Sequence, residues 1–67
     1  MQRRPVESSH IASLGWDDET LEVEFHSGHI FQYHEVPESV YQGLLGADSV
    51  GKEFFQVKGR YQSTKLK

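Results

Sequence analysis

The segment of residues 20–36 constrains the fold most strongly, because two runs of alternating apolar and polar residues flank a turn that contains glycine. Alternation with a period of two is typical of a half-buried β-strand. In the first run, Leu21, Val23 and Phe25 alternate with polar side chains. The segment is therefore predicted to form a β-hairpin with one buried face.

The length of the hairpin loop decides which side chains share that face. A three-residue loop at residues 26–28, with Gly28 in the left-handed conformation, pairs Val23 with Phe31. A strict two-residue turn would pair Val23 with Gln32 instead and would divide the apolar side chains between both faces, which a buried face does not tolerate. We therefore predict the three-residue loop. It brings five apolar side chains to one face, namely Leu21, Val23, Phe25, Phe31 and Tyr33.

The segments on either side of the hairpin extend it into an α+β domain. Residues 9–16 are predicted to form a first strand, which a polar turn at residues 17–19 joins to the hairpin. Pro37 ends the sheet and suits the first position of a helix, where its missing N–H costs no hydrogen bond. Two amphipathic helices follow from apolar residues at helical spacing, namely Val40, Tyr41, Leu44 and Leu45 in the first, and Val50, Phe54 and Val57 in the second.

The expected fold is a three-stranded antiparallel sheet followed by two short helices packed on one face, in the order β-β-β-α-α. Gly46 is expected to end the first helix, and Asp48 or Ser49 to cap the second. The opposite face of the sheet is expected to meet solvent. It would carry the remaining side chains of the hairpin, namely Glu22, Glu24, Ile30, Gln32 and His34.

The 67 residues are expected to form one domain, residues 1–67, with mobile ends at about residues 1–5 and 62–67. Cysteine is absent from the sequence, so neither a disulfide nor a thiolate-bound metal is expected to support the core. No apolar run approaches the roughly 18 residues of a membrane span, and the first residues lack the apolar segment of a signal peptide. We expect a monomeric, cytoplasmic protein without membrane contact, cofactor or metal.

Several short motifs occur together along the chain. They are Arg4-Pro5-Val6 followed by Ser8-Ser9, then Gly15-Trp16-Asp17, the run of residues 21–25, Phe31-Gln32-Tyr33, and Val36-Pro37 with Val40-Tyr41 and Leu44. In this combination the chain resembles the KTSC domain family, named for the C-terminal region of some lysyl-tRNA synthetases. Phe31 and Tyr33 stand where the family has a Tyr-x-Tyr motif, while His10, Phe31 and Phe55 depart from its usual residues. The resemblance implies a small domain of unestablished function, with RNA binding suggested by the fusion to synthetases.

Basic residues gather towards the two ends of the sequence. All ten acidic residues lie between Glu7 and Glu53, where Lys52 is the only base. Bases can neutralise phosphates and a tyrosine can stack on an unpaired base. The candidates for contacting RNA are Arg4, Lys52, Lys58, Arg60 and Tyr61. The alternative is that these bases only keep an acidic protein soluble, which a pI near 5.7 favours.

Other side chains receive ordinary structural interpretations. Phe31 and Tyr33 could stack on bases, but their predicted position beneath the helices favours a role in the core. The histidines are expected to be exposed, because they do not converge as metal ligands would. Glu22 and Glu24 are expected to keep an open sheet face soluble rather than to act as paired catalytic carboxylates.

The sequence thus indicates a noncatalytic module that binds RNA weakly through phosphates. The alternative is a protein-interaction adaptor that uses the exposed sheet face or a free strand edge, in which Ile30 would matter more than the bases. Salt would weaken the first kind of binding strongly and the second only a little. An enzyme is not expected, because so short a chain has no room for a deep cleft with a convergent acid, base and nucleophile.

Overall fold

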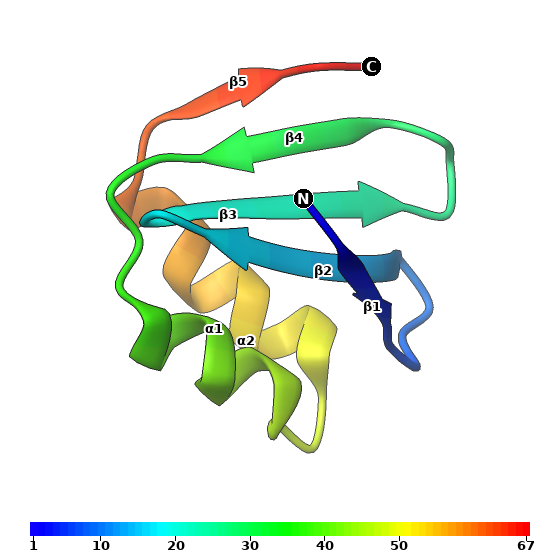
Figure 1. The fold of residues 1–67 in the computed structure, drawn as a ribbon. Helices are drawn as coiled ribbons and strands as arrows, with labels where there is room; N and C mark the ends of the chain where they lie inside the picture. Colours follow the sequence, from blue (N-terminus) through cyan, green and yellow to red (C-terminus); the bar gives the residue numbers. More distant parts are fainter.

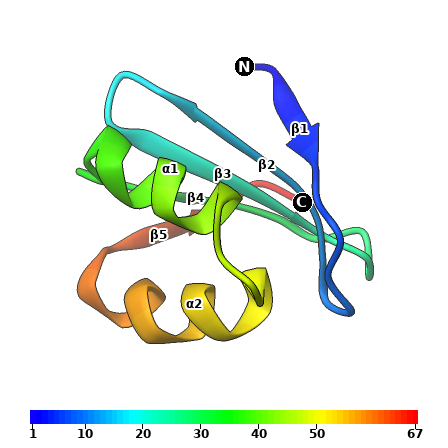
Figure 2. The same cartoon turned by 90° about the horizontal axis from the view of Figure 1, so that it is seen from below.

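Five antiparallel strands form one sheet in the computed structural model, which describes residues 1–67. The strands lie in chain order as β1 (Arg3–Pro5), β2 (Ile11–Asp17), β3 (Thr20–Phe25), β4 (Ile30–Tyr33) and β5 (Ser63–Lys65). Helices α1 (Glu38–Leu45) and α2 (Val50–Val57) cover one face of the sheet (Figures 1 and 2). A short 3₁₀ helix, η1 (Lys58–Arg60), leads from α2 into β5.

The predicted α+β class and the two helices are confirmed, but the predicted count of three strands is wrong. The additional strands lie at the two ends of the chain, where β1 pairs with β2 and β5 pairs with β4. Each is only three residues long, so neither contains enough alternation to be recognised in the sequence. The predicted mobility of the ends stays a prediction.

The predicted register of the hairpin between β3 and β4 is confirmed. Val23 pairs with Phe31, and the Phe25 N–H donates a 2.9 Å hydrogen bond to the carbonyl oxygen of His29. This bond closes the predicted three-residue loop at residues 26–28. Gly28 has a φ of +96°, a conformation that residues with a side chain rarely adopt.

The core lies between the sheet and the two helices. Leu14, Val23 and Leu44 are completely buried there. The Trp16 indole N–H donates a 2.7 Å hydrogen bond to the Val36 carbonyl oxygen, which fixes the connection between β4 and α1 against the sheet. The complete set of buried apolar residues is Ile11, Leu14, Leu21, Val23, Tyr33, Val36, Tyr41, Leu44, Val50, Phe54 and Val57.

The observed ends of the helices lie close to the positions predicted from the sequence. Pro37 is the N-cap of α1 rather than its first helical residue, one position from the prediction. Ser49 caps α2, because its hydroxyl oxygen accepts a 3.3 Å hydrogen bond from the Lys52 N–H. The cap orients the first turn of α2, from which Lys52 points to solvent.

The face of the sheet opposite the helices is less open than predicted, since Glu22 is only 8% exposed. Its carboxylate accepts hydrogen bonds from Arg3 Nη1 at 2.7 Å and from Gln32 Nε2 at 3.0 Å. The Ser13 hydroxyl donates to Glu24 at 2.8 Å. The prediction that Glu22 meets solvent is therefore wrong, because β1 was not foreseen and Arg3 of β1 covers this carboxylate.

Candidate ligand-binding groove

The predicted basic candidates do not gather at one site. Lys58 lines a groove beside α2, and Lys52 lines the hollow that adjoins it. Arg4 lines a third hollow, formed by β1 and the segment between the helices. Arg60 and Tyr61 border a fourth hollow, which Glu35 also lines. Only the two lysines on and just after α2 therefore adjoin a common surface.

That surface is the exposed side of α2. Lys52, Phe55 and Lys58 follow one another at intervals of three residues, so their side chains lie along the same side of the helix. We call these three residues the α2 stripe. Phe55 is 60% exposed, and Lys58 Nζ lies 4.5 Å from the centroid of its ring, in a cation–π contact. The stripe combines an open aromatic ring with a positive charge on either side.

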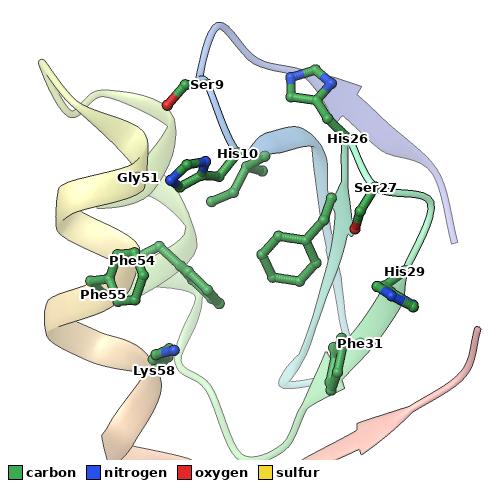
Figure 3. A pocket seen from close by; sticks show the side chains of 12 residues that line it. Ser9, His10, His26, Ser27, His29, Phe31, Gly51, Phe54, Phe55 and Lys58 are labelled. Atoms are coloured by element: carbon green, nitrogen blue, oxygen red, sulfur yellow. The ribbon is translucent and has the colours of Figure 1, made fainter.

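A groove of about 450 Å³ lies between α2 and the end of the β3–β4 hairpin (Figure 3). This volume falls within the range of small-molecule sites in proteins. In Figure 3, Phe54, Phe55 and Lys58 project from the helix on one side, and Ser27, His29 and Phe31 lie on the hairpin on the other. Its lining residues are Ser9, His10, Ile11, Phe25, His26, Ser27, His29, Phe31, Gly51, Phe54, Phe55 and Lys58.

The floor of the groove is aromatic and continuous with the core. The Phe25 ring meets Phe31 and Phe54 edge-on, with centroids 5.9 Å apart in each pair. Phe54 in turn meets Tyr33 at 5.3 Å. The rings pack against one another, and Phe25 and Phe31 remain partly exposed and line the groove.

The rim of the groove carries three histidines and Lys58, and no carboxylate is among the lining residues. His26 Nε2 donates a 2.8 Å hydrogen bond to the Ser8 carbonyl oxygen, and His29 Nδ1 lies 3.3 Å from the carbonyl oxygen of Lys67. A carbonyl oxygen only accepts, so each of these nitrogens bears the proton. This assignment leaves His26 Nδ1 and His29 Nε2 available to a ligand.

Phe31 and Tyr33, the aromatic pair singled out in the sequence, occupy different environments. Tyr33 belongs to the buried core, and burial raises the pKa of its phenol above the ordinary value of 10.0. Phe31 packs against the core but also lines the groove. The rings are stacked at an interplanar angle of 27°, with centroids 6.4 Å apart. Only Phe31 is therefore accessible to a ligand in this conformation.

Sequence reasoning missed most of the groove. Phe55 is the one residue whose position in the sequence indicated an exposed apolar surface, because it falls outside the apolar stripe that α2 buries. The residues at which the sequence departs from the pattern it resembles, His10, Phe31 and Phe55, all line the groove. The structure brings no three histidine or carboxylate side chains close enough together to hold a metal ion. None of its helices is both long and apolar enough to cross a bilayer.

Comparison with known proteins finds relatives that span most of the chain. The profile of the KTSC domain matches residues 7–62. An uncharacterized protein of Stutzerimonas stutzeri is 51% identical over 59 residues, which cover 85% of this chain and 83% of that relative. A protein of Tsukamurella paurometabola is 41% identical over 51 residues, which are 73% of this chain and 76% of the relative.

A solved structure extends the likeness to the whole fold. The crystal structure of a KTSC domain protein from Yersinia pestis superposes with a TM-score of 0.90 at 41% sequence identity. The match covers 98% of this chain and 97% of that one. The terminal strands thus belong to the matched region together with the central hairpin and the helices.

Proposed function

The chain belongs to the KTSC domain family, and from that premise we propose that it is a noncatalytic module that binds single-stranded RNA weakly through the exposed side of α2. Family membership supplies no activity by itself, since a relative of the chain is named an uncharacterized protein. The proposal therefore rests on the geometry of the α2 stripe and of the groove beside it.

The observation that carries the proposal is the α2 stripe. Proteins that bind single strands without sequence preference combine basic side chains that follow the phosphates with aromatic rings that stack on bases. Lys52 and Lys58 supply the first element, and the open ring of Phe55 between them supplies the second. Two lysines neutralise few phosphates, and the protein carries a net charge of −3, so the affinity is weak and falls with salt.

Arg60 and Tyr61 follow Lys58 in the chain, but they border a separate hollow that Glu35 also lines, so the proposed surface does not include them. Arg4 lies on β1 and borders a different hollow, so it is not part of the proposed surface. The resemblance to a region of tRNA synthetases favours RNA over DNA as the ligand.

The alternative of a protein adaptor draws less support from the structure. The sheet face that it would use already satisfies its own polar groups, as Glu22 accepts from Arg3 and Gln32. Ile30 on the same face is half-buried. Both sheet edges are strands of only three residues, which offer a partner strand few hydrogen bonds.

An NMR titration of the labelled domain with a short single-stranded RNA, at low and at physiological salt, tests the proposal. We expect salt-sensitive shifts at residues 52–58. The double variant Lys52→Glu with Lys58→Glu should lose affinity, and the slope of log affinity against log salt should shrink by about 1.4, since a single strand contributes about 0.7 for each phosphate.

The matched control is Arg4→Glu with Arg60→Glu, which changes the net charge equally at exposed residues that border other hollows. This control should keep most of the affinity. If both double variants lose affinity to the same extent, the binding follows net charge and the proposed surface is wrong. If neither loses affinity, the lysines of the stripe make no contact with phosphates.

A further inference from the structure

We infer that the groove between α2 and the β3–β4 hairpin holds one unpaired base of the bound RNA, with a neighbouring phosphate at Lys58. The inference rests on the proposed RNA binding and adds to it a site for a particular part of the ligand. The two lysines of the α2 stripe alone would bind any flexible polyanion. A base pocket beside it would make the protein distinguish nucleic acid from other polyanions.

The shape and chemistry of the floor suit a flat heterocycle. Phe25 and Phe31 present partly exposed rings from the hairpin, and Phe55 presents its ring from the helix. Every base has a π-face that stacks on such rings, whatever its sequence identity. The edge-on packing of Phe25 against Phe31 and Phe54 holds the floor in place before a ligand arrives, so little ordering accompanies binding.

Charge complementarity favours an occupant that is part of an anion. The chain contains ten acidic residues, yet the groove is lined by none of them and carries Lys58 at its rim. Lys58 Nζ lies over one face of the Phe55 ring, 4.5 Å from its centroid, so a base that stacks on the other face would bring its phosphate towards this charge. An uncharged apolar ligand would gain nothing from such a rim.

The rim also provides partners for the edge of a base. The hydrogen bonds to the carbonyl oxygens of Ser8 and Lys67 fix the rings of His26 and His29 and leave one nitrogen of each free. A neutral nitrogen of this kind accepts a hydrogen bond, and a protonated one donates. A base inside a duplex is covered on both faces by its neighbours, so only an unpaired base reaches the groove.

The test compares two RNA strands of equal length and charge, an oligoadenylate and the same strand with abasic positions. For the unaltered protein we expect the abasic strand to bind about tenfold more weakly, because it loses the stacking of a base. Ser27 lies exposed at the groove, so Ser27→Tyr should fill the groove while keeping every lysine and histidine. This variant should bind both strands equally, at the level of the abasic strand.

The control variant is Ser39→Tyr, the same substitution at an exposed position on α1 away from the groove. It should keep the preference for the strand that bears bases. Equal affinity for both strands in the unaltered protein, with no effect of Ser27→Tyr, overturns the base pocket and leaves phosphate binding by the α2 stripe standing. Absence of binding by either strand overturns the proposed function and the pocket together.

One further outcome would assign the groove to another partner. If an acidic peptide containing phenylalanine binds, if Ser27→Tyr abolishes that binding, and if the bases make no difference to RNA affinity, the groove takes a protein side chain. This result would also overturn the base pocket.

Discussion

Arg3 of β1 and Glu22 of β3 form an ion pair of 2.7 Å that crosses the intervening strand β2. Arg3 and Glu22 both pair with Gly15 of β2, one from each side. Because glycine has no side chain, the arginine passes over β2 and reaches the carboxylate. The pair thus joins β1 directly to the centre of the sheet, beyond the strand to which β1 is hydrogen-bonded.

We predict that Arg3 and Glu22 are energetically coupled. The Glu22 side chain is 10% exposed and that of Arg3 is 27% exposed, so solvent screens this pair less than an ordinary surface pair. A double-mutant cycle with Arg3→Met and Glu22→Gln, measured by urea unfolding, should give a coupling free energy of about 1 kcal/mol. A coupling free energy near zero would mean that β1 is held by its backbone hydrogen bonds alone.

We predict that Gly15→Ala destabilises the protein. A Cβ atom at this position would lie 2.7 Å from the Gln2 carbonyl oxygen and 3.0 Å from Arg3 Cγ, so β1 would have to move away. The expected loss is about 1–3 kcal/mol in the free energy of unfolding. The chain offers a matched control in Gly43 of α1, where an added Cβ meets nothing within 4 Å.

Gly43→Ala should stabilise the protein by about 0.5–1 kcal/mol, because alanine favours the helix interior more than glycine does. Chemical denaturation of both variants measures the two effects with opposite signs. A stable Gly15→Ala variant with unchanged NMR signals at residues 3–5 would contradict the close approach of β1 to β2.

The buried phenol of Tyr33 predicts a loss of stability in alkaline solution. Burial raises the pKa of Tyr33 in the folded protein above the ordinary value of 10.0, which the unfolded chain keeps. Above about pH 10 the unfolded chain therefore loses this proton first, and unfolding becomes more favourable. The contribution is fully present at lower pH and disappears as pH rises through the folded-state pKa.

Urea unfolding at about pH 9 and pH 11 checks this expectation, with Tyr33→Phe as the variant that lacks the titrating group. The loss of stability between the two pH values should be smaller in Tyr33→Phe than in the unaltered protein. Tyr61→Phe, at a half-buried tyrosine outside the buried core cluster, is the control and should behave like the unaltered protein. Identical losses in all three proteins would contradict the prediction.

We predict that the hydrogen bonds to the C-terminal segment open more often than those of the core. The Ile30 N–H donates to the Lys67 carbonyl oxygen and the His34 N–H to that of Gln62, both in an exposed part of the chain. The Val36 N–H donates to the Glu19 carbonyl oxygen beside a completely buried side chain. Hydrogen exchange at Ile30 and His34 should be at least about tenfold faster than at Val36.

Equal protection at the three amides would show that β5 opens only when the whole domain unfolds. The expected mobility of residues 62–67 would then be wrong, and that of residues 1–5 would need a separate test. The NMR signals used in the RNA titration also report this exchange, so one labelled sample serves both measurements.

The central hairpin could be predicted from the sequence because an error of one residue would have moved its apolar side chains to the wrong face. Tyr33 therefore had to align with Leu21, and it does. No comparable constraint applies to β1 or β5. Their side chains are mostly exposed, and each strand is defined by the partner that it meets in the fold rather than by its own pattern.

The groove could not be predicted because segments far apart in the sequence build it. The chain around His10 meets the end of the hairpin and one side of α2 only after the helices have packed on the sheet. Phe55 was visible as an apolar residue outside the buried stripe of its helix, but what lies opposite to it depends on the packing. The basic candidates were chosen by charge alone, and charge does not reveal which of them share a surface.

The order of the strands in the sheet has a consequence for the speed of folding. Because the strands lie in the sheet in chain order, β1 to β4 form a meander in which each pairing closes only a short loop. Such local contacts form rapidly. The pairing of β5 with β4 closes a much longer loop, because both helices lie between these strands in the chain. The transition state for folding should therefore contain the meander and lack β5, so substitutions in β5 should alter the rate of unfolding and leave the rate of folding unchanged.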